Sequence, residues 1–252
     1  MRFLFHLYKM DPIESSRLAL KLNLGVELSF VTHDFLNYKK DKLELLKKVL
    51  TSIKVKSVHG PFRDLQPGSE DPFIRAVTAE RYLQAIEISK ILQVDWTLFH
   101  LNYFWNGHEA LRKKWLDRAI NIFLLLKDYD LEIRVENSHE KDPRIFKEFL
   151  KIINSEFTVN FCLDPSHVLA YSDKEIDEWI NTLAPYIREV HLSETRKGFD
   201  LHFPLGSGLF DTRKFLEKIE ETLGSEIDIT IEPRSIDELK ISLRWLEKNN
   251  YL

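Results

Sequence analysis

Residues 158–167 read Thr-Val-Asn-Phe-Cys-Leu-Asp-Pro-Ser-His, an apolar run that ends in an aspartate, with a histidine three residues later. The apolar run is typical of a buried strand, and the Asp-Pro step marks the turn that follows it. Five other apolar runs of this chain are also followed by a His, Asp or Glu. Six strands in a row with such endings predict a ring of side chains that converge on one point.

Nine residues make up this set, and every one is of a type that binds metal ions. They are His59 in SVHGPF, His100 in TLFHLN, Glu136 in IRVENS, Asp164 and His167 in FCLDPSH, His191 in EVHLSE, Asp200 and His202 in FDLHFPLG, and Glu232 in ITIEPR. A lone histidine near a strand end is more often a structural residue. On that ground the set leaves out His6, His33, His108 and His139.

Strand-like and helix-like segments alternate along the whole chain. The expected strands are 2–8, 25–30, 54–59, 94–100, 131–136, 158–163, 187–192 and 227–232. The expected helices are 12–23, 41–52, 72–92, 109–127, 142–154, 174–184, 211–223 and 236–248. Asp11-Pro12, Asp71-Pro72, Asp142-Pro143 and Ser235 supply N-cap signals at four of the helix starts.

Eight β-then-α units predict an α/β fold with a parallel sheet, and a single (β/α)8 TIM barrel over residues 1–252 is the natural closed form. A chain of roughly 250 residues is the usual size for that barrel. A doubly wound open sheet is the rival, but it binds ligands at one switch point, whereas the nine residues follow six successive strands. The ring therefore favours the barrel, with a metal site at the C-terminal ends of its strands.

Composition excludes some classes of protein. The net charge of −4, from 36 Lys+Arg and 40 Asp+Glu, gives no overall attraction to nucleic acid or to an anionic membrane. No apolar run approaches the roughly 20 residues of a membrane span. The single Cys162 excludes an intrachain disulfide and is in keeping with a reducing compartment, so we expect a cytoplasmic protein.

The mixture of imidazole and carboxylate ligands suits a divalent transition metal rather than Mg²⁺ or Ca²⁺. The residues leave zinc, manganese, iron and cobalt open, with one to three ions per chain. Carboxylates such as Glu136 and Glu232, half-buried after apolar strands, would be costly without a cation or hydrogen-bond donors.

The chain resembles the xylose isomerase-like TIM-barrel superfamily, which includes sugar isomerases, epimerases and endonuclease IV (AP endonuclease family 2). Phe161–His167 is similar to the C-[LIVM]-D-T-C-H motif of endonuclease IV, and His191–Arg196 with Asp200-Leu-His202 is similar to its later motifs. The resemblance implies one ion at His59, His100 and Glu136, and a third at His167, Asp200 and His202. A second would lie at Glu136, Asp164, His191 and Glu232, with Glu136 as a bridge.

Other residues depart from endonuclease IV. Its tyrosine and asparagine are missing from His59–Leu65, Leu201 replaces the arginine of its D-R-H motif, and its basic DNA-gripping loops are absent. His59–Ser69 and Pro204–Gly208 look instead like proteins labelled sugar phosphate isomerase/epimerase. In that branch one metal at Glu136, Asp164, His191 and Glu232 is sufficient. The arginine that usually follows the strand-seven histidine by six residues is Lys197 here.

Two reactions remain open from the sequence. In an isomerase or epimerase, Glu136 and Glu232 transfer protons, and His167 hydrogen-bonds a hydroxyl of a small carbohydrate or sugar phosphate. In a zinc phosphoesterase of the AP endonuclease type, all nine residues are employed, although duplex DNA is the less favoured substrate. The first reaction is favoured by the overall pattern and the second by the number of ligands. Candidate substrate-binding residues are Arg63, Trp105, Arg196, Lys197 and Arg234.

Overall fold

The computed structural model describes residues 1–8, 10–30, 39–104 and 109–252. Its strands form one closed parallel barrel, in which each strand pairs with the next and the last pairs with the first. The strands are β1 (Arg2–His6), β2 (Gly25–Ser29), β3 (Lys56–His59), β4 (Trp96–His100), β5 (Glu132–Glu136), β6 (Val159–Leu163), β7 (Ile187–Leu192) and β8 (Asp228–Ile231). The predicted (β/α)8 barrel is confirmed.

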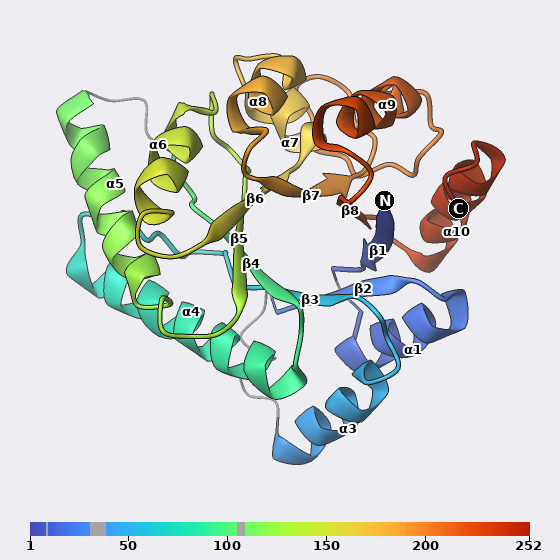
Figure 1. The fold of residues 1–252 in the computed structure, drawn as a ribbon, viewed down its shortest axis with the longest axis horizontal. Coiled ribbons are helices and arrows are strands. Elements are labelled where there is room, and N and C mark those ends of the chain that lie inside the picture. Colours follow the sequence, from blue (N-terminus) through green and yellow to red (C-terminus); the bar gives the residue numbers. More distant parts are fainter. Residues whose placement is uncertain (9, 31–38, 105–108) are drawn as a thin grey trace.

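Helices stand around the outside of the strands (Figure 1). They are α1 (Pro12–Leu22), α3 (Lys40–Leu50), α4 (Pro72–Leu92), α5 (Glu109–Leu124), α6 (Arg144–Ile153), α7 (Pro165–Tyr171), α8 (Ile176–Leu183), α9 (Thr212–Leu223) and α10 (Ile236–Lys248). Within the described residues, no helix is long and apolar enough to cross a membrane.

The helix starts follow the signals in the sequence. Asp11 accepts a hydrogen bond from the Ile13 amide at 2.9 Å, and Asp71 accepts one from Phe73 at 2.8 Å, so both side chains cap their helices. The helix expected from residue 142 begins instead at Arg144, because Pro143 is its cap residue. The helix α7 was not expected at all, since its seven residues are too few for a helical period to be visible.

Aromatic side chains fill much of the layer between strands and helices. Tyr82 of α4 lies 4.3 Å from Phe99 of β4, measured between ring centroids, and Phe123 of α5 lies 4.9 Å from Phe149 of α6. All four are fully buried. Each such side chain contributes about 1.5–3 kcal/mol of hydrophobic stabilisation, so this layer holds the helices against the strands.

Charged groups fill the interior of the barrel at its lower end, the end at which the strands begin. The guanidinium of Arg134 lies 3.6 Å above the ring of Trp96 and pairs with Glu189 at 3.2 Å and Asp228 at 3.0 Å. All four side chains are buried. Arg2 pairs with Asp228 from outside at 2.7 Å. Each of these buried charges therefore has an oppositely charged partner at the floor of the barrel, which offsets the cost of burying it.

Candidate metal centre

The candidate ligands stand where their strands end. His59, His100 and Glu136 are the last residues of β3, β4 and β5, and Asp164 and Glu232 directly follow β6 and β8. Parallel strands in a closed barrel bring these ends to one mouth. All nine predicted ligands come together there, in groups whose donor atoms lie within 4.8 Å of one another.

His59, His100 and Glu136 form the first group. The Nε2 atoms of His59 and His100 lie 3.4 and 3.1 Å from Oε2 of Glu136, and 3.2 Å from each other. His59 Nδ1 lies 3.0 Å from the carbonyl of Gly60. Because a carbonyl only accepts, Nδ1 carries the proton and Nε2 is the nitrogen that can bind a metal.

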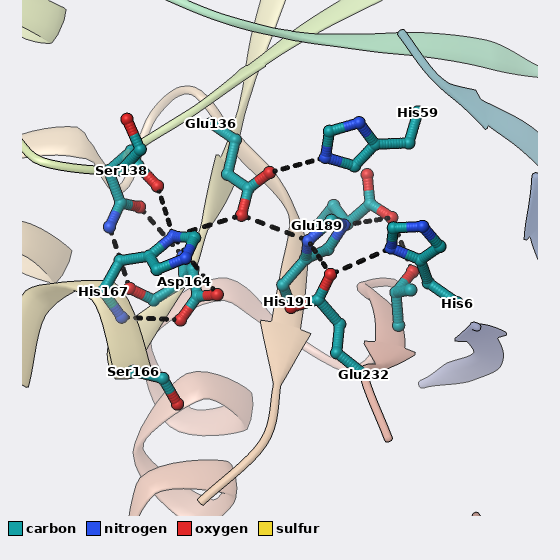
Figure 2. Close-up of polar contacts among 12 residues, drawn as sticks. His6, His59, Glu136, Ser138, Asp164, Ser166, His167, Glu189, His191 and Glu232 are labelled. Carbon is teal, nitrogen blue, oxygen red and sulfur yellow. Dashed lines mark hydrogen bonds and ion pairs between the residues drawn. The ribbon is translucent and has the colours of Figure 1, made fainter. Parts of the chain in front are cut away.

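The central group contains Asp164, His191 and Glu232. Nδ1 of His191 lies 3.1 Å from Oε1 of Glu232 and 3.2 Å from Oε1 of Glu136, so the two glutamates meet at this nitrogen (Figure 2). Asp164 caps α7, and its Oδ1 accepts a hydrogen bond from the His167 amide at 2.9 Å. Its second oxygen is left over for a further partner.

His167, Asp200 and His202 form the third group. His202 Nε2 lies 2.9 Å from Oδ1 of Asp200, and His167 Nε2 lies 3.6 Å from Oδ2 of the same residue. His167 Nδ1 donates to the carbonyl of Asn137 at 2.8 Å, which turns Nε2 toward Asp200. The group is only partly buried, so it lies at the outer edge of the centre.

The loop after β7 carries two residues of the third group and is anchored by a buried carboxylate. Glu194 accepts hydrogen bonds from the amides of Gly206 and Leu209, at 2.7 and 3.1 Å, and from the Thr212 hydroxyl at 2.7 Å. Its backbone pairs with that of Phe203. The loop is therefore folded onto the barrel by a side chain that the sequence did not single out.

The charges of the centre call for a cation. Burial opposes a charge on His167 and on His202, yet nearby carboxylates raise the pKa of His167 to about 9 and that of His202 to about 10. Although burial opposes ionisation there too, His191 and other histidines hold the pKa of Glu136 and of Glu232 well below the usual range. Burial lowers the pKa of His100 to about 4, against the opposing effect of Glu136. The ionised carboxylates thus attract positive charge to this place.

Unpaired polar atoms also indicate that the centre binds a cation. Within the described part of the chain, no hydrogen bond reaches the buried oxygens Glu136 Oε2, Asp164 Oδ2 and Glu232 Oε2. A buried carboxylate oxygen without a donor is costly, and a bound cation removes that cost. The residues present therefore fit a divalent transition metal, because the donors are imidazole nitrogens and carboxylate oxygens.

The expected substrate-binding residues lie farther out on the surface. Arg234 pairs with Glu238, Lys197 lies 3.6 Å from Glu175, and Arg196 stacks on Phe199 at 4.3 Å. Arg63 lies 5.1 Å above the ring of Tyr8. These four are exposed and in contact with surface neighbours. Trp105 lies outside the described residues.

Two buried residues near the centre come from strands that were expected to contribute nothing. His6, the last residue of β1, lies 3.0 Å from Oε1 of Glu232. Glu27 of β2 lies 3.2 Å from Nε2 of His191. A signal for His6 existed, since it ends an apolar run as His59 and His100 do, but a lone histidine of this kind is more often structural, which is why the predicted set leaves it out.

A pocket of about 490 Å³ opens beside the third group. Its lining combines aromatic rings with charged side chains of both signs: Tyr103, Phe104, His139 and Tyr171, with Glu109, Arg112, Lys141, Asp142, Arg144 and Asp173. The His139 ring packs on Tyr171 with centroids 4.4 Å apart, and the Tyr171 hydroxyl lies 3.5 Å from Oδ2 of Asp200. A row of aromatic faces thus runs from the rim toward the centre.

The family model described as xylose isomerase-like TIM barrel matches residues 23–249 of this chain. The uncharacterised protein MJ1311 of Methanocaldococcus jannaschii is 27% identical over 191 residues, which cover 71% of this chain and 64% of that protein. The chain thus spans less than two thirds of the length of this curated relative.

Solved structures share the fold over nearly the whole chain. A D-tagatose 3-epimerase-like protein has a TM-score of 0.82 at 22% identity, over 98% of this chain and 96% of that one. The TTHB071 protein of Thermus thermophilus, soaked with ZnCl2, has a TM-score of 0.77 at 24% identity over the same shares. Endonuclease IV of the same organism has 0.71 at 17% identity, over 98% of this chain and all of that one.

Proposed function

This chain belongs to the xylose isomerase-like TIM-barrel family, and from that premise we propose that it is a divalent-metal-dependent isomerase or epimerase of a small carbohydrate or sugar phosphate. The observation that carries the proposal is the placement of Glu136 and Glu232. Their Oε1 atoms lie 3.2 and 3.1 Å from the same nitrogen of His191. Two carboxylates that converge on one ligand are suited to pass a proton to and from a substrate held between them.

Glu136, Asp164, His191 and Glu232 would hold the central ion. A divalent cation bound there supplies Lewis acidity, which lowers the pKa of the C–H beside a substrate carbonyl. One of the two glutamates then takes that proton, and the other returns a proton to the neighbouring carbon or to the opposite face of the same carbon. The proton that one carboxylate takes up is matched by the proton that the other gives, so the pair as a whole neither gains nor loses a proton over the cycle.

His167 and the aromatic pocket would orient the substrate. His167 Nε2 faces the outer part of the centre, where it can donate to a substrate hydroxyl. The pocket volume of about 490 Å³ matches a small ring compound, and aromatic faces such as Tyr171 and His139 are suited to the C–H face of a sugar.

Phosphoester hydrolysis is the second candidate, and one observation favours it. The donor atoms form three groups around one mouth, whereas isomerisation gives no evident task to His59, His100, Asp200 and His202. Several cations side by side neutralise the charge of a phosphate ester under attack. The surface argues against duplex DNA as the ester, because Arg234 and Lys197 are paired with Glu238 and Glu175.

The double variant Asp200→Asn, His202→Gln separates the two candidates. It keeps the size and polarity of both side chains but weakens the third group. For an isomerase or epimerase we expect the central ion to remain and turnover to fall by about 10-fold, because only residues around the ligands of the central ion are changed. For a phosphoesterase we expect a loss of about a thousandfold or more.

The measurement is the metal content of both proteins by elemental analysis, with their turnover on a panel of ketoses, sugar phosphates and phosphodiesters. The wild type should carry at least one zinc, manganese, iron or cobalt ion. Lys127→Gln is the matched control, since it changes an exposed charge that is paired with Glu156 and belongs to no candidate site. A collapse of sugar turnover with the central ion still bound would contradict the proposed division of the ligands.

A further inference from the structure

His6 and Glu232 meet inside the barrel mouth. His6 is 5% exposed, and its Nδ1 lies 3.0 Å from Oε1 of Glu232. A carboxylate oxygen accepts hydrogen bonds, so the 3.0 Å contact places the proton on Nδ1 of His6, which donates a hydrogen bond to Oε1.

The other contacts of His6 hold its ring in place. One face stacks on the ring of His59, with centroids 5.1 Å apart and 26° between the planes. Nδ1 also lies 3.6 Å from Oε1 of Glu27, whose second oxygen accepts a hydrogen bond from Ser57 at 3.0 Å. His6 is the register partner of Glu27, and Glu27 that of Ser57, so three adjacent strands support this ring.

The two ring nitrogens of His6 differ in their use. Nε2 is buried and has no hydrogen-bond partner in the described residues, whereas Nδ1 faces two carboxylates. On the Glu232 side, Oε1 accepts the hydrogen bond from His6 and also lies 3.1 Å from Nδ1 of His191. Oε2 has no hydrogen-bond partner in the described residues and lies 3.4 Å from Nδ1 of His202. Because His191 belongs to the candidate ligands of the central ion, His6 Nδ1 is the donor beside them that can hold the Glu232 carboxylate in its orientation.

We propose that His6 is a positioning residue, which holds Glu232 in place through Nδ1–H and so tightens metal binding at the central group. The inference rests on the proposed ligand role of Glu232. A donor bonded to a carboxylate ligand fixes its orientation, and loss of such a partner costs about 10–100-fold in metal affinity.

The test uses variants that keep or remove one nitrogen at a time. His6→Asn places an amide N–H near the position of Nδ1, His6→Gln places it near Nε2, and His6→Phe keeps the ring that stacks on His59 but has no donor. Each full-length protein is stripped of metal and titrated with Co²⁺. The affinity is followed by visible absorbance and by competition with a chelator, and turnover is measured on the substrate that the wild type accepts.

We expect His6→Asn to bind Co²⁺ within about 3-fold of the wild type, and His6→Phe and His6→Gln to bind it about 10–100-fold more weakly. Wild-type affinity in His6→Phe would overturn the proposal, as would equal losses in Asn and Gln. Should His6→Phe not fold, the comparison of Asn with Gln decides alone. If the affinities follow the expected order but no protein turns over any sugar, the proposed function fails and the role of His6 stands.

Discussion

Glu136 and Glu232 are the residues on which both candidate reactions depend. Glu136 lies within 3.5 Å of His59, His100, His167 and His191, so it contacts members of all three groups. We expect Glu136→Gln and Glu232→Gln each to lower turnover by about a thousandfold or more, because the amide keeps the shape but neither binds a cation well nor transfers a proton.

The fold should survive both substitutions, since the side chains lie at the mouth rather than in the packed layer. Circular dichroism and turnover measure the two effects separately. Glu175→Gln, at a side chain that is 82% exposed, serves as the control. Turnover near that of the wild type in either glutamine variant would exclude the assigned centre.

Glu140 offers a test of pH dependence away from the candidate ligands. It is buried and accepts hydrogen bonds from the amides of Tyr103 and Ser138, and burial raises its pKa to about 7. Between the ordinary carboxyl value of about 4.5 and pH 7, the folded protein keeps this proton and the unfolded chain has lost it. Stability conferred by this group is therefore present at low pH and is lost as the pH rises toward 7.

We expect the free energy of unfolding of the wild type, relative to Glu140→Gln, to fall by about 1–3 kcal/mol between pH 4.5 and 8. Urea denaturation of both proteins across that range gives the difference. Parallel curves for the two proteins would show that Glu140 titrates at its ordinary pKa.

The nine candidate ligands could be singled out from the sequence because each follows an apolar run, and the structure does bring them together. The residues that hold these side chains in place could not be found from the sequence. Glu27 lies in the middle of a strand, Glu194 holds a loop, and Asn137 exchanges hydrogen bonds with the backbone of Asp164 at 2.8 and 2.9 Å. These contacts join strands and loops that are distant in sequence, so no local pattern reveals them.

Among the elements, the long loop after β7 is the one whose conformation matters most for the third group. A buried carboxylate with three donors is costly to replace, because each lost bond leaves a buried N–H or hydroxyl unpaired. We expect Glu194→Gln to cost about 2–4 kcal/mol of stability and to raise hydrogen–deuterium exchange over residues 193–210. Thr212→Val removes only the 2.7 Å hydroxyl contact and should have a smaller effect on both. Unchanged exchange in Glu194→Gln would mean that other contacts hold the loop.

The order of the elements was predictable, and most of their ends were not. Helix α4 has the expected bounds, because proline fixes its start and an Asp caps it. The strand expected over 54–59 begins only at Lys56, which is where the backbone first pairs with its neighbours. Pairing with another strand decides such an end, and a single sequence does not display the partner.

At the scale of the whole molecule, the surface charges do not favour binding to a polyanion such as DNA. The net charge is −4, and rim cations such as Arg234 and Lys197 have acidic partners. We expect binding to an abasic-site duplex to be weaker than micromolar at physiological salt, and to weaken further as salt rises. Fluorescence anisotropy at two salt concentrations measures this, with an undamaged duplex as the control. Nanomolar affinity with strand cleavage would favour the phosphoesterase instead.

The filled lower end of the barrel affects how ions and substrates reach the candidate ligands. Arg134, Glu189, Asp228 and Trp96 are buried and in mutual contact, so side chains occupy the interior at that end. Whatever reaches the ligands must arrive through the mouth and leave the same way. A substrate at the mouth would then share one route with any ion that the candidate ligands hold, so exchange of the ion should slow when the substrate is bound.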